Sequence, residues 1–356
     1  MPVKKNRLIF PPHTALFYLK QNLSFPMHIT EVGLAPEFEE LVISQGIKTL
    51  YPPQARAVEE GVANGQSILL CTPTASGKTL TAMLGIFSTL SKGGKCLYVA
   101  PLKALAQEKY DELKPLKALG YRVTLEVGDL DSTHESEKKF DVMVATAEKC
   151  DSILRSRPQQ FSDLKILVLD EIHLIHSDRG PVYEVLASRF RKLNPKIQIL
   201  GLSATVGNAR ELSDWIGAKL VTSNWRPVTL REEAVLAGEK TLEKLVADSL
   251  EDGGQVMVFV NSRKSAESVA EKLGEKLKLK GCATTSEKLL STLSSPTKQC
   301  RRLAACVGNA TAFHHAGLVN RQRTIIEESF KKGLVKIIAA TPTLAAGVNL
   351  PSRTVI

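Results

Sequence analysis

The sequence predicts an α/β fold of two domains, each built on a mostly parallel sheet that helices cover. Its 356 residues suit about two domains of ordinary size, each able to bury its own core. Apolar runs of strand length alternate with helix-like runs, and this alternation stops near residue 217 and begins again near residue 241. Such alternation is typical of parallel strands joined by covering helices.

The first series supplies six predicted strands. They are the apolar runs at residues 67–70, 95–100, 123–127, 142–146, 166–170 and 197–203. In open sheets of this kind, ligands bind beyond the carboxyl ends of the strands. Lys78, Asp170 and Ser203 fall there, so we expect runs that are far apart in the sequence to meet at one edge.

The second series begins with a helix near residue 241. It continues with a strand at 256–260, a long helical region at 264–307, a strand near Phe313, a helix at 319–331 and a strand at 336–340. Residues 353–356 resemble a strand cut short, with no helix behind it. We therefore expect the second sheet to be incomplete and the chain to be part of a longer one.

Prolines and polar residues suggest the domain boundaries. Residues 1–28 contain four prolines and little periodicity, and are interpreted as an N-terminal extension. Residues 222–230 contain a proline and polar residues typical of a linker. The expected organisation is a first domain at 29–222, a linker at 223–232 and a second domain at 233–356.

Composition narrows the class of protein. Lys and Arg number 47 against 37 Asp and Glu, and the net charge of +10 favours a polyanionic partner such as nucleic acid. No apolar run approaches the roughly 20 residues that span a bilayer, and no signal peptide is evident, so we expect a cytoplasmic protein without membrane contact. Six cysteines without a Cys-x-x-Cys pair indicate reduced thiols.

A phosphate-binding loop is predicted between the first strand and the helix after it. The loop residues are Thr74, Ala75, Ser76, Gly77, Lys78 and Thr79. Small residues let backbone N–H groups reach phosphate oxygens, Lys78 would neutralise the outer phosphates, and the Thr79 hydroxyl would bind magnesium. Thr72 occupies the first glycine position of the strict pattern, so a polar strand-to-helix turn is the alternative interpretation.

Two acids at the carboxyl end of the strand at 166–170 favour a nucleotide site over a plain turn. Asp170 would hold Mg²⁺ through water, and Glu171 would orient or deprotonate the attacking water. An isolated Asp-Glu pair is usually a solvated turn, but its position relative to Lys78 favours ATP hydrolysis. His173 is expected to hydrogen-bond between this site and the neighbouring strand, rather than to bind metal.

These motifs resemble those of superfamily 2 DExH-box helicases of the Ski-like branch, most of all the archaeal DNA repair helicases related to HELQ and the helicase domain of polymerase theta. The resemblance covers residues 29–356. It rests on ordered segments at 50–54 (LYPPQ), 73–79 (PTASGKT), 101–106 (PLKALA), 146–149 (TAEK), 170–173 (DEIH), 203–208 (SATVGN), 261–263 (NSR), 313–317 (FHHAG) and 340–351 (ATPTLAAGVNLP).

The resemblance implies two RecA-like domains with ATP and Mg²⁺ in the cleft between them. Gln54 would read the adenine, and Gly347 would reach the nucleotide from the second domain. Ser203 and Thr205 would couple hydrolysis to domain closure. A strand of DNA would run across both domains along a backbone track lined by Pro101, Lys103, Thr146, Lys149, Asn261, Arg263 and Thr341.

By this resemblance the chain is the motor core of an ATP-dependent DNA helicase that moves 3′ to 5′ on single-stranded or forked DNA. We expect a monomer, associated with the nucleoid if archaeal. The family's last motif, with an arginine that contacts the terminal phosphate, would lie beyond Ile356, and lacking such an arginine costs roughly 10³ to 10⁵ in rate. Weak activity of the chain alone is therefore expected. The alternatives are an RNA helicase and a nucleotide-gated clamp.

Overall fold

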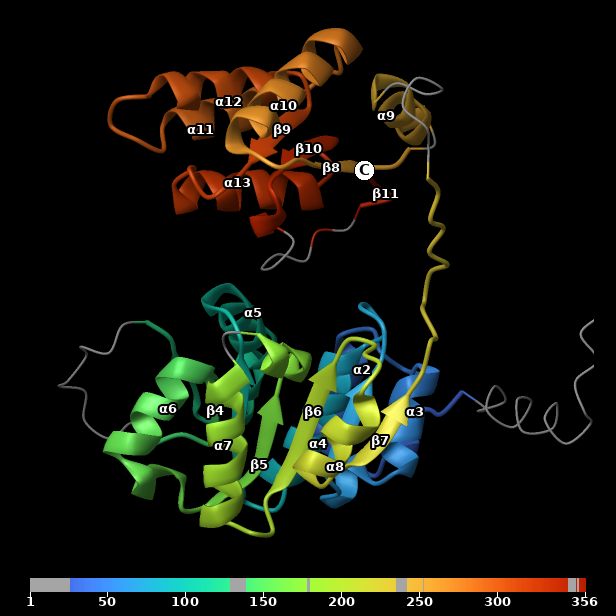
Figure 1. The fold of residues 1–356 in the computed structure, drawn as a ribbon, viewed down its shortest axis with the longest axis vertical. Coiled ribbons are helices and arrows are strands. Elements are labelled where there is room, and N and C mark those ends of the chain that lie inside the picture. The colour runs from blue at the N-terminus through green and yellow to red at the C-terminus, as the bar shows by residue number, and fades with distance from the viewer. Residues whose placement is uncertain are drawn as a thin grey trace, which may run out of the picture. The chain divides into compact units, whose positions relative to one another are not determined.

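A computed structural model describes residues 26–128, 139–177, 180–234, 242–251, 253–344, 350 and 352–356. The chain forms two compact units that divide between Leu230 and Arg231 (Figure 1). Each unit contains a parallel sheet flanked by helices, which confirms the predicted α/β fold. Within the described ranges, no helix combines the length and the apolar character needed to cross a membrane.

The first sheet has the strand order β3-β4-β2-β5-β6-β1-β7, and its pairings are parallel. Its strands are β1 (Ile68–Cys71), β2 (Lys95–Ala100), β3 (Val123–Glu126), β4 (Val142–Thr146), β5 (Leu164–Leu169), β6 (Gln198–Ser203) and β7 (Lys219–Thr222). Six of these lie where the apolar runs predict them. Strand β7 was not predicted, because only Val221 within it is buried and no apolar run marks it.

Helices cover both faces of the first sheet, as Figure 1 shows. One face packs against α2 (Pro36–Ser44), α3 (Pro52–Glu59), α4 (Lys78–Leu90) and α5 (Lys103–Leu113). The other face packs against α6 (Ala147–Ser156), α7 (Gly180–Leu193) and α8 (Ala209–Ile216). Alternate residues of each strand point into the hydrophobic cores on the two faces of the sheet. Ile68 faces the core under α2 to α5, and Leu69 faces the core under α6 to α8.

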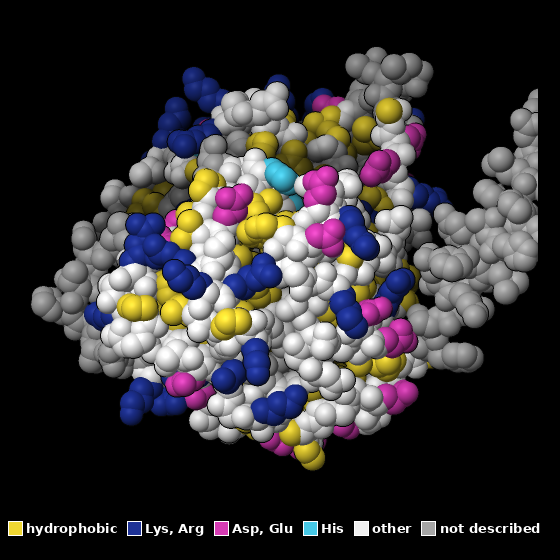
Figure 2. Space-filling model, turned by 60° about the horizontal axis from the view of Figure 1, so that its bottom comes forward, with side chains coloured by type: hydrophobic (Ala, Val, Ile, Leu, Met, Phe, Trp, Pro, Cys, Tyr) yellow, Lys and Arg dark blue, Asp and Glu magenta, His cyan; other side chains and the backbone are white. Residues whose placement is uncertain are grey.

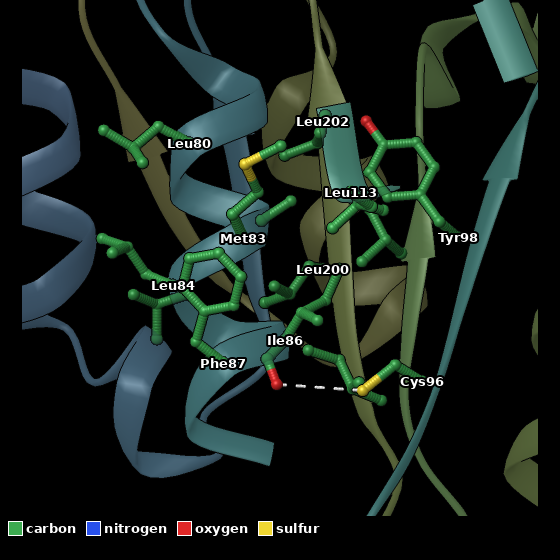
Figure 3. Close-up of a cluster of buried hydrophobic side chains, with 14 of the residues drawn as sticks. Leu80, Met83, Leu84, Ile86, Phe87, Cys96, Tyr98, Leu113, Leu200 and Leu202 are labelled. Atoms are coloured by element: carbon green, nitrogen blue, oxygen red, sulfur yellow. Dashed lines mark hydrogen bonds between the residues drawn. The ribbon is translucent and has the colours of Figure 1, made fainter. Parts of the chain in front are cut away.

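Helix α4 lies at the centre of the first core. In Figure 3, Met83 and Phe87 of α4 lie among side chains of the sheet such as Leu200. Burying one such side chain stabilises the fold by about 1.5–3 kcal/mol. The helix packs closely because Gly85 lacks a Cβ, which would lie 2.8 Å from Leu200 Cδ1. The loop before α4 is thereby anchored to a rigid support.

The second sheet has the strand order β11-β8-β10-β9, again with parallel pairing. Its strands are β8 (Val256–Phe259), β9 (Thr311–His314), β10 (Ile337–Ala340) and β11 (Thr354–Val355). Around it lie α9 (Leu242–Glu251), α10 (Arg263–Leu277), α11 (Ala283–Leu290), α12 (Lys298–Gly308) and α13 (Asn320–Lys331). Short 3₁₀ helices complete the described chain: η1 (Ile29–Glu31), η2 (Val62–Asn64), η3 (Lys114–Leu119), η4 (Pro158–Phe161), η5 (Ile172–His176) and η6 (Pro342–Leu344).

The predicted helical region at 264–307 is helical but divided, because the chain breaks twice there. Helix α10 ends at Leu277, and its C-cap residue Lys278 has φ of 46°, in the left-handed region. Thr297 starts α12 by accepting a hydrogen bond from the N–H of Cys300 on its hydroxyl. The region therefore holds three helices, α10, α11 and α12.

Candidate functional site

Three adjacent strands of the first sheet, β5, β6 and β1, end side by side. Thr72 follows β1, Ser203 ends β6, and Asp170 follows β5. The register pairs Cys71 with Ser203 and Leu169 with Gly201, so the three ends are nearly level. The loop that precedes α4 and the acids after β5 consequently share one edge of the first unit.

The loop between β1 and α4 is held in a fixed shape. Ala75 and Gly77 have left-handed backbones, with φ of 67° and 83°. Thr72 and Ser76 are buried, and their hydroxyls lie 2.6 Å apart in a hydrogen bond that closes the loop. Thr72 stands where the strict sequence pattern has its first glycine, and its side chain makes this closing contact. The loop opens onto the amino end of α4, which favours an anion.

Gln54 is held beside this loop by one hydrogen bond to the loop and one to the start of its own helix. Its Nε2 donates to the carbonyl of Gly77 at 3.0 Å, and its Oε1 accepts from the N–H of Tyr51 at 2.7 Å. A Cβ at position 77 would lie 1.9 Å from Gln54 Nε2 and would displace that side chain, and the positive φ of Gly77 also favours glycine there. The arrangement places Gln54 directly beside the predicted phosphate loop.

Lys78 points back into the loop. Its Nζ donates to the carbonyls of Thr72 at 3.1 Å and Pro73 at 3.3 Å. Burial lowers the pKa of Lys78, whereas the nearby Glu171 and Asp170 raise it. Phosphate oxygens entering the loop could replace the two carbonyls as partners of the ammonium group, with a stronger, charge-assisted bond.

Asp170 is held rigidly at the end of β5, with only 6% of its surface exposed. Its Oδ2 accepts from the hydroxyl of Tyr98 at 2.8 Å, and its Oδ1 accepts from the N–H of Glu171 at 3.0 Å. The hydroxyl of Tyr183 donates to its backbone carbonyl at 3.0 Å. Burial raises the pKa of Asp170, and the neighbouring Glu171 raises it further.

The donor set near Asp170 suits Mg²⁺ that arrives with a nucleotide. Asp170 and the Thr79 hydroxyl supply hard oxygens, and magnesium is usually bound by one or two carboxylates together with phosphates and water. No group of three or more His, Cys, Asp or Glu side chains that could hold a metal occurs within the described ranges. The phosphates would therefore complete the coordination, and the residues present fit the metal on that condition.

Glu171 and His173 connect the acids to the end of β6. Glu171 has a left-handed backbone with φ of 50°. The N–H of Ala204 donates to Nδ1 of His173 at 3.4 Å, and Glu171 Oε2 lies 3.3 Å from the same nitrogen. Burial lowers the pKa of His173, and Lys78 adds to this effect. The His173 ring thus connects η5 to the residue that follows β6.

The other residues after β6 differ in exposure. Ser203 is buried and donates through Oγ to the carbonyl of Ala204 at 2.8 Å, whereas Thr205 is exposed. His176, at the end of η5, lies 2.9 Å from the side-chain nitrogen of Asn208. The segment that follows the strand is therefore tied to η5 at two points.

The predicted backbone track of the first unit lies after β2 and β4, which are neighbours in the sheet. Pro101 follows β2 and Lys103 begins α5, where it is exposed. Thr146 ends β4 and accepts the N–H of Lys149 on its hydroxyl at 3.4 Å. Lys149 is only 9% exposed, so it is not the solvated surface charge that its sequence position alone would suggest.

The predicted track of the second unit also follows adjacent strands. Asn261 and Arg263 are exposed after β8, and Thr341 is buried directly after β10. The prediction for Gly347 lies outside the described residues. In the same unit, His314 and His315 are buried at the end of β9. Each unit thus carries its own half of the proposed track.

Two residues near the acids were missed by the sequence reasoning. Tyr98 lies inside β2, and in the sequence it cannot be told apart from an ordinary core residue. Figure 3 shows its ring at the border of the hydrophobic cluster, with its oxygen turned away from Cys96. Lys109 lies on the buried side of α5 with Ala106 and Leu113. A lysine where the helical period calls for an apolar residue is a usable signal.

Comparisons with known proteins agree with this geometry. The DEAD/DEAH box helicase family matches residues 51–212, which include the loop, the acids and the end of β6. The chain is similar to proteins named ATP-dependent DNA helicase Hel308 from Methanocella arvoryzae (44% identity), Pyrococcus abyssi (42%) and Pyrococcus horikoshii (43%).

Each of these alignments covers 93% of this chain and 48% of the relative, so the chain spans about half the length of the curated relatives it matches. The two parallel sheets with flanking helices match the RecA-like α/β fold. The ordered motifs, the fold and the relatives agree: residues 51–212 match the DEAD/DEAH box helicase family, and the chain is similar to the archaeal Hel308 proteins.

Proposed function

We propose that this chain is the motor core of an ATP-dependent DNA helicase that moves 3′ to 5′ along single-stranded DNA during repair or replication-fork processing. One observation carries the proposal: a loop lysine, a helix-start threonine and two acids from distant segments share one sheet edge. They are Lys78, Thr79, Asp170 and Glu171. The names of the Hel308 relatives support DNA as the substrate.

Each of these residues of the first unit would have a separate role in ATP hydrolysis. Lys78 and the loop N–H groups would bind the outer phosphates, where negative charge develops. Thr79 and Asp170 would hold Mg²⁺, which supplies Lewis-acid stabilisation of the phosphate charge. Glu171 would orient and deprotonate the attacking water. His173, through the N–H of Ala204, would pass changes at Glu171 to the segment after β6.

Coupling to movement requires the second domain. In this proposal residues 29–222 and 233–356 act as RecA-like domains joined by a linker at 223–232. Gln54 would bind the adenine and Gly347 would reach the nucleotide from the second domain. Ser203 and Thr205 would respond to closure, so that the grip on DNA changes as nucleotide binds and leaves.

DNA would be held by its backbone. Thr146 and Thr341 supply strand-end hydroxyls and N–H groups, and Lys103 and Arg263 supply charge, with Pro101, Lys149 and Asn261 beside them. On the face drawn in Figure 2, basic side chains are scattered among acidic ones. The track is supported by the strand-end loops, where Lys103 and Arg263 are exposed. Such binding is independent of sequence and weakens with salt; in an archaeal cell it would place the protein at the nucleoid.

Steady-state ATP hydrolysis with single-stranded DNA, single-stranded RNA or no nucleic acid tests the proposal, with Glu171→Gln as the inactive control. We expect DNA to stimulate turnover more than RNA does. Equal or greater stimulation by RNA would contradict the DNA assignment. Nucleotide binding without any turnover would favour a nucleotide-gated clamp over a motor.

The direction of movement is tested with streptavidin bound to one end of a DNA strand. We expect ATP-dependent displacement from the 5′ end and none above background from the 3′ end. The reverse pattern would contradict 3′ to 5′ movement.

A further inference from the structure

Lys109 is a buried lysine that the proposed hydrolysis does not use. It lies in α5, on the side of the helix that faces the core, and only 7% of its surface is exposed. Lysine is almost never buried unless its charge is matched. The hydrogen-bond partners of Lys109 should therefore indicate the role of its positive charge.

The ammonium group of Lys109 is fully hydrogen-bonded. Its Nζ donates to Thr79 Oγ1 at 3.0 Å, Glu112 Oε1 at 3.0 Å and Glu108 Oε1 at 3.2 Å. Three acceptors use all three N–H donors of an ammonium group, so its position is fixed. One of the three is the hydroxyl assigned to Mg²⁺.

The surroundings of this group are acidic. Asp170 interacts electrostatically with Lys109, and Glu112 lies near Tyr98, whose hydroxyl is bonded to Asp170. Burial alone would lower the pKa of Lys109, but Glu112 and Glu108 raise it above its ordinary value. The ammonium thus neutralises a cluster of carboxylates on the metal side of the site.

We propose that Lys109 is a positioning residue that acts as a built-in cation at the Thr79 hydroxyl and makes metal binding depend on nucleotide. A divalent ion at Thr79 Oγ1 is repelled by an ammonium group bonded to the same oxygen. Without nucleotide, Lys109 therefore excludes the metal. The phosphates supply the extra negative charge and ligands that overcome this repulsion, and Glu112 and Glu108 hold the ammonium when it leaves Thr79. This inference rests on the proposed nucleotide site.

Mn²⁺ binding measured by electron paramagnetic resonance tests the role of Lys109 without relying on activity. In the absence of nucleotide, Lys109→Met should lower the Mn²⁺ dissociation constant about tenfold or more relative to the wild type. Lys114→Met, which removes an exposed lysine just after α5, should leave it unchanged. Lys109→Met together with Glu112→Gln should return it towards the wild-type value, because the local charge is restored.

Should Lys109→Met fail to fold, Lys109→Gln carries the same expectation, since it keeps hydrogen bonding and removes the charge. Mn²⁺ affinity no greater in these variants than in the wild type would overturn the inference, provided that ADP still binds and Lys78→Ala weakens its binding. Absence of ADP binding in the wild type would instead contradict the proposed nucleotide site.

Discussion

Single residues of the phosphate loop are constrained by contacts as well as by backbone shape. Gly77 has a positive φ, and its carbonyl accepts the side chain of Gln54. The glycine therefore keeps Gln54 against the loop. Positive φ alone can be separated from this contact, because other glycines share the conformation without a neighbour.

Gly77→Ala should weaken ATP binding at least tenfold, because the new Cβ displaces Gln54. The matched control is Gly46→Ala: Gly46 has φ of 84°, but nothing lies within 4 Å of its ideal Cβ. Both variants should lose about 1–2 kcal/mol of stability to left-handed strain. Calorimetric titration with ATP checks the difference, and equal ATP affinity in the two variants would contradict the role of Gly77.

Lys78→Ala and Glu171→Gln should separate binding from chemistry. Losing the charged hydrogen bonds of Lys78 should cost about 1.5–3 kcal/mol of nucleotide binding. Glu171→Gln should keep nucleotide affinity and lower turnover by about 10²-fold or more, because the general base is lost. Fluorescent-nucleotide binding and single-turnover hydrolysis measure the two effects. Unaltered binding in Lys78→Ala would refute the phosphate-loop assignment.

The sequence predicts the residues that carry local patterns and misses those that act through tertiary contacts. Lys78 and Asp170 stand at strand ends, where both the spacing and the chemistry are visible. Tyr98 is indistinguishable from a core residue until the fold brings its hydroxyl to Asp170. The burial of Lys149 was likewise invisible, because a lysine in the first turn of a helix is normally solvated.

At the scale of elements, an ion cluster fastens α12 to α10 in the second unit. Arg302 binds Glu271 with two hydrogen bonds, from Nε at 2.6 Å and from Nη2 at 2.9 Å, and also contacts Glu267. Bidentate geometry distinguishes this pair from ordinary surface ion pairs, which contribute little.

Arg302→Met should therefore lower the free energy of unfolding by about 1–2 kcal/mol. Arg301→Met is the matched control, because Arg301 is exposed on the same helix, and its effect should stay within about 0.5 kcal/mol. Urea denaturation checks both. Equal effects would show that the cluster does not fasten the two helices.

Element boundaries could be predicted where the signals were strong. Helix α8 ends at Ile216, as the pattern indicates, because Gly217 adopts the left-handed cap conformation. The breaks between α10, α11 and α12 had weaker signals: Pro296 precedes the Thr297 cap, but a lysine in a left-handed cap, as at Lys278, leaves no mark in the sequence. Strand β7 was not predicted from the sequence, because an edge strand needs few apolar residues.

At the scale of the whole molecule, stability should depend on pH through buried His315, which is 1% exposed. The N–H of Gly317 donates to its Nδ1 at 3.1 Å, so the neutral ring presents Nε2 to Glu267 Oε1 at 3.3 Å. Burial lowers its pKa; Glu267 opposes this effect, and Arg263 and His314 add to it.

Because the folded pKa of His315 lies below the unfolded value, the unfolded chain binds the proton first. The contribution of this group is complete above about pH 6.5 and is lost as the pH falls towards the folded pKa, by at most about 1.4 kcal/mol per pH unit. Urea denaturation at pH 7.5 and 5.5 should show a smaller loss in His315→Gln than in the wild type. An identical loss in both would contradict this assignment.

ATP hydrolysis by this chain depends most on four side chains meeting around one triphosphate and its metal. The most direct measurement is a crystal structure with Mg²⁺ and a non-hydrolysable ATP analogue. We predict phosphates in the loop before α4, Mg²⁺ at about 2.1 Å from Thr79 Oγ1, and Asp170 linked to the metal through water. Nucleotide bound away from Lys78, or metal without contact to Thr79 and Asp170, would contradict the account.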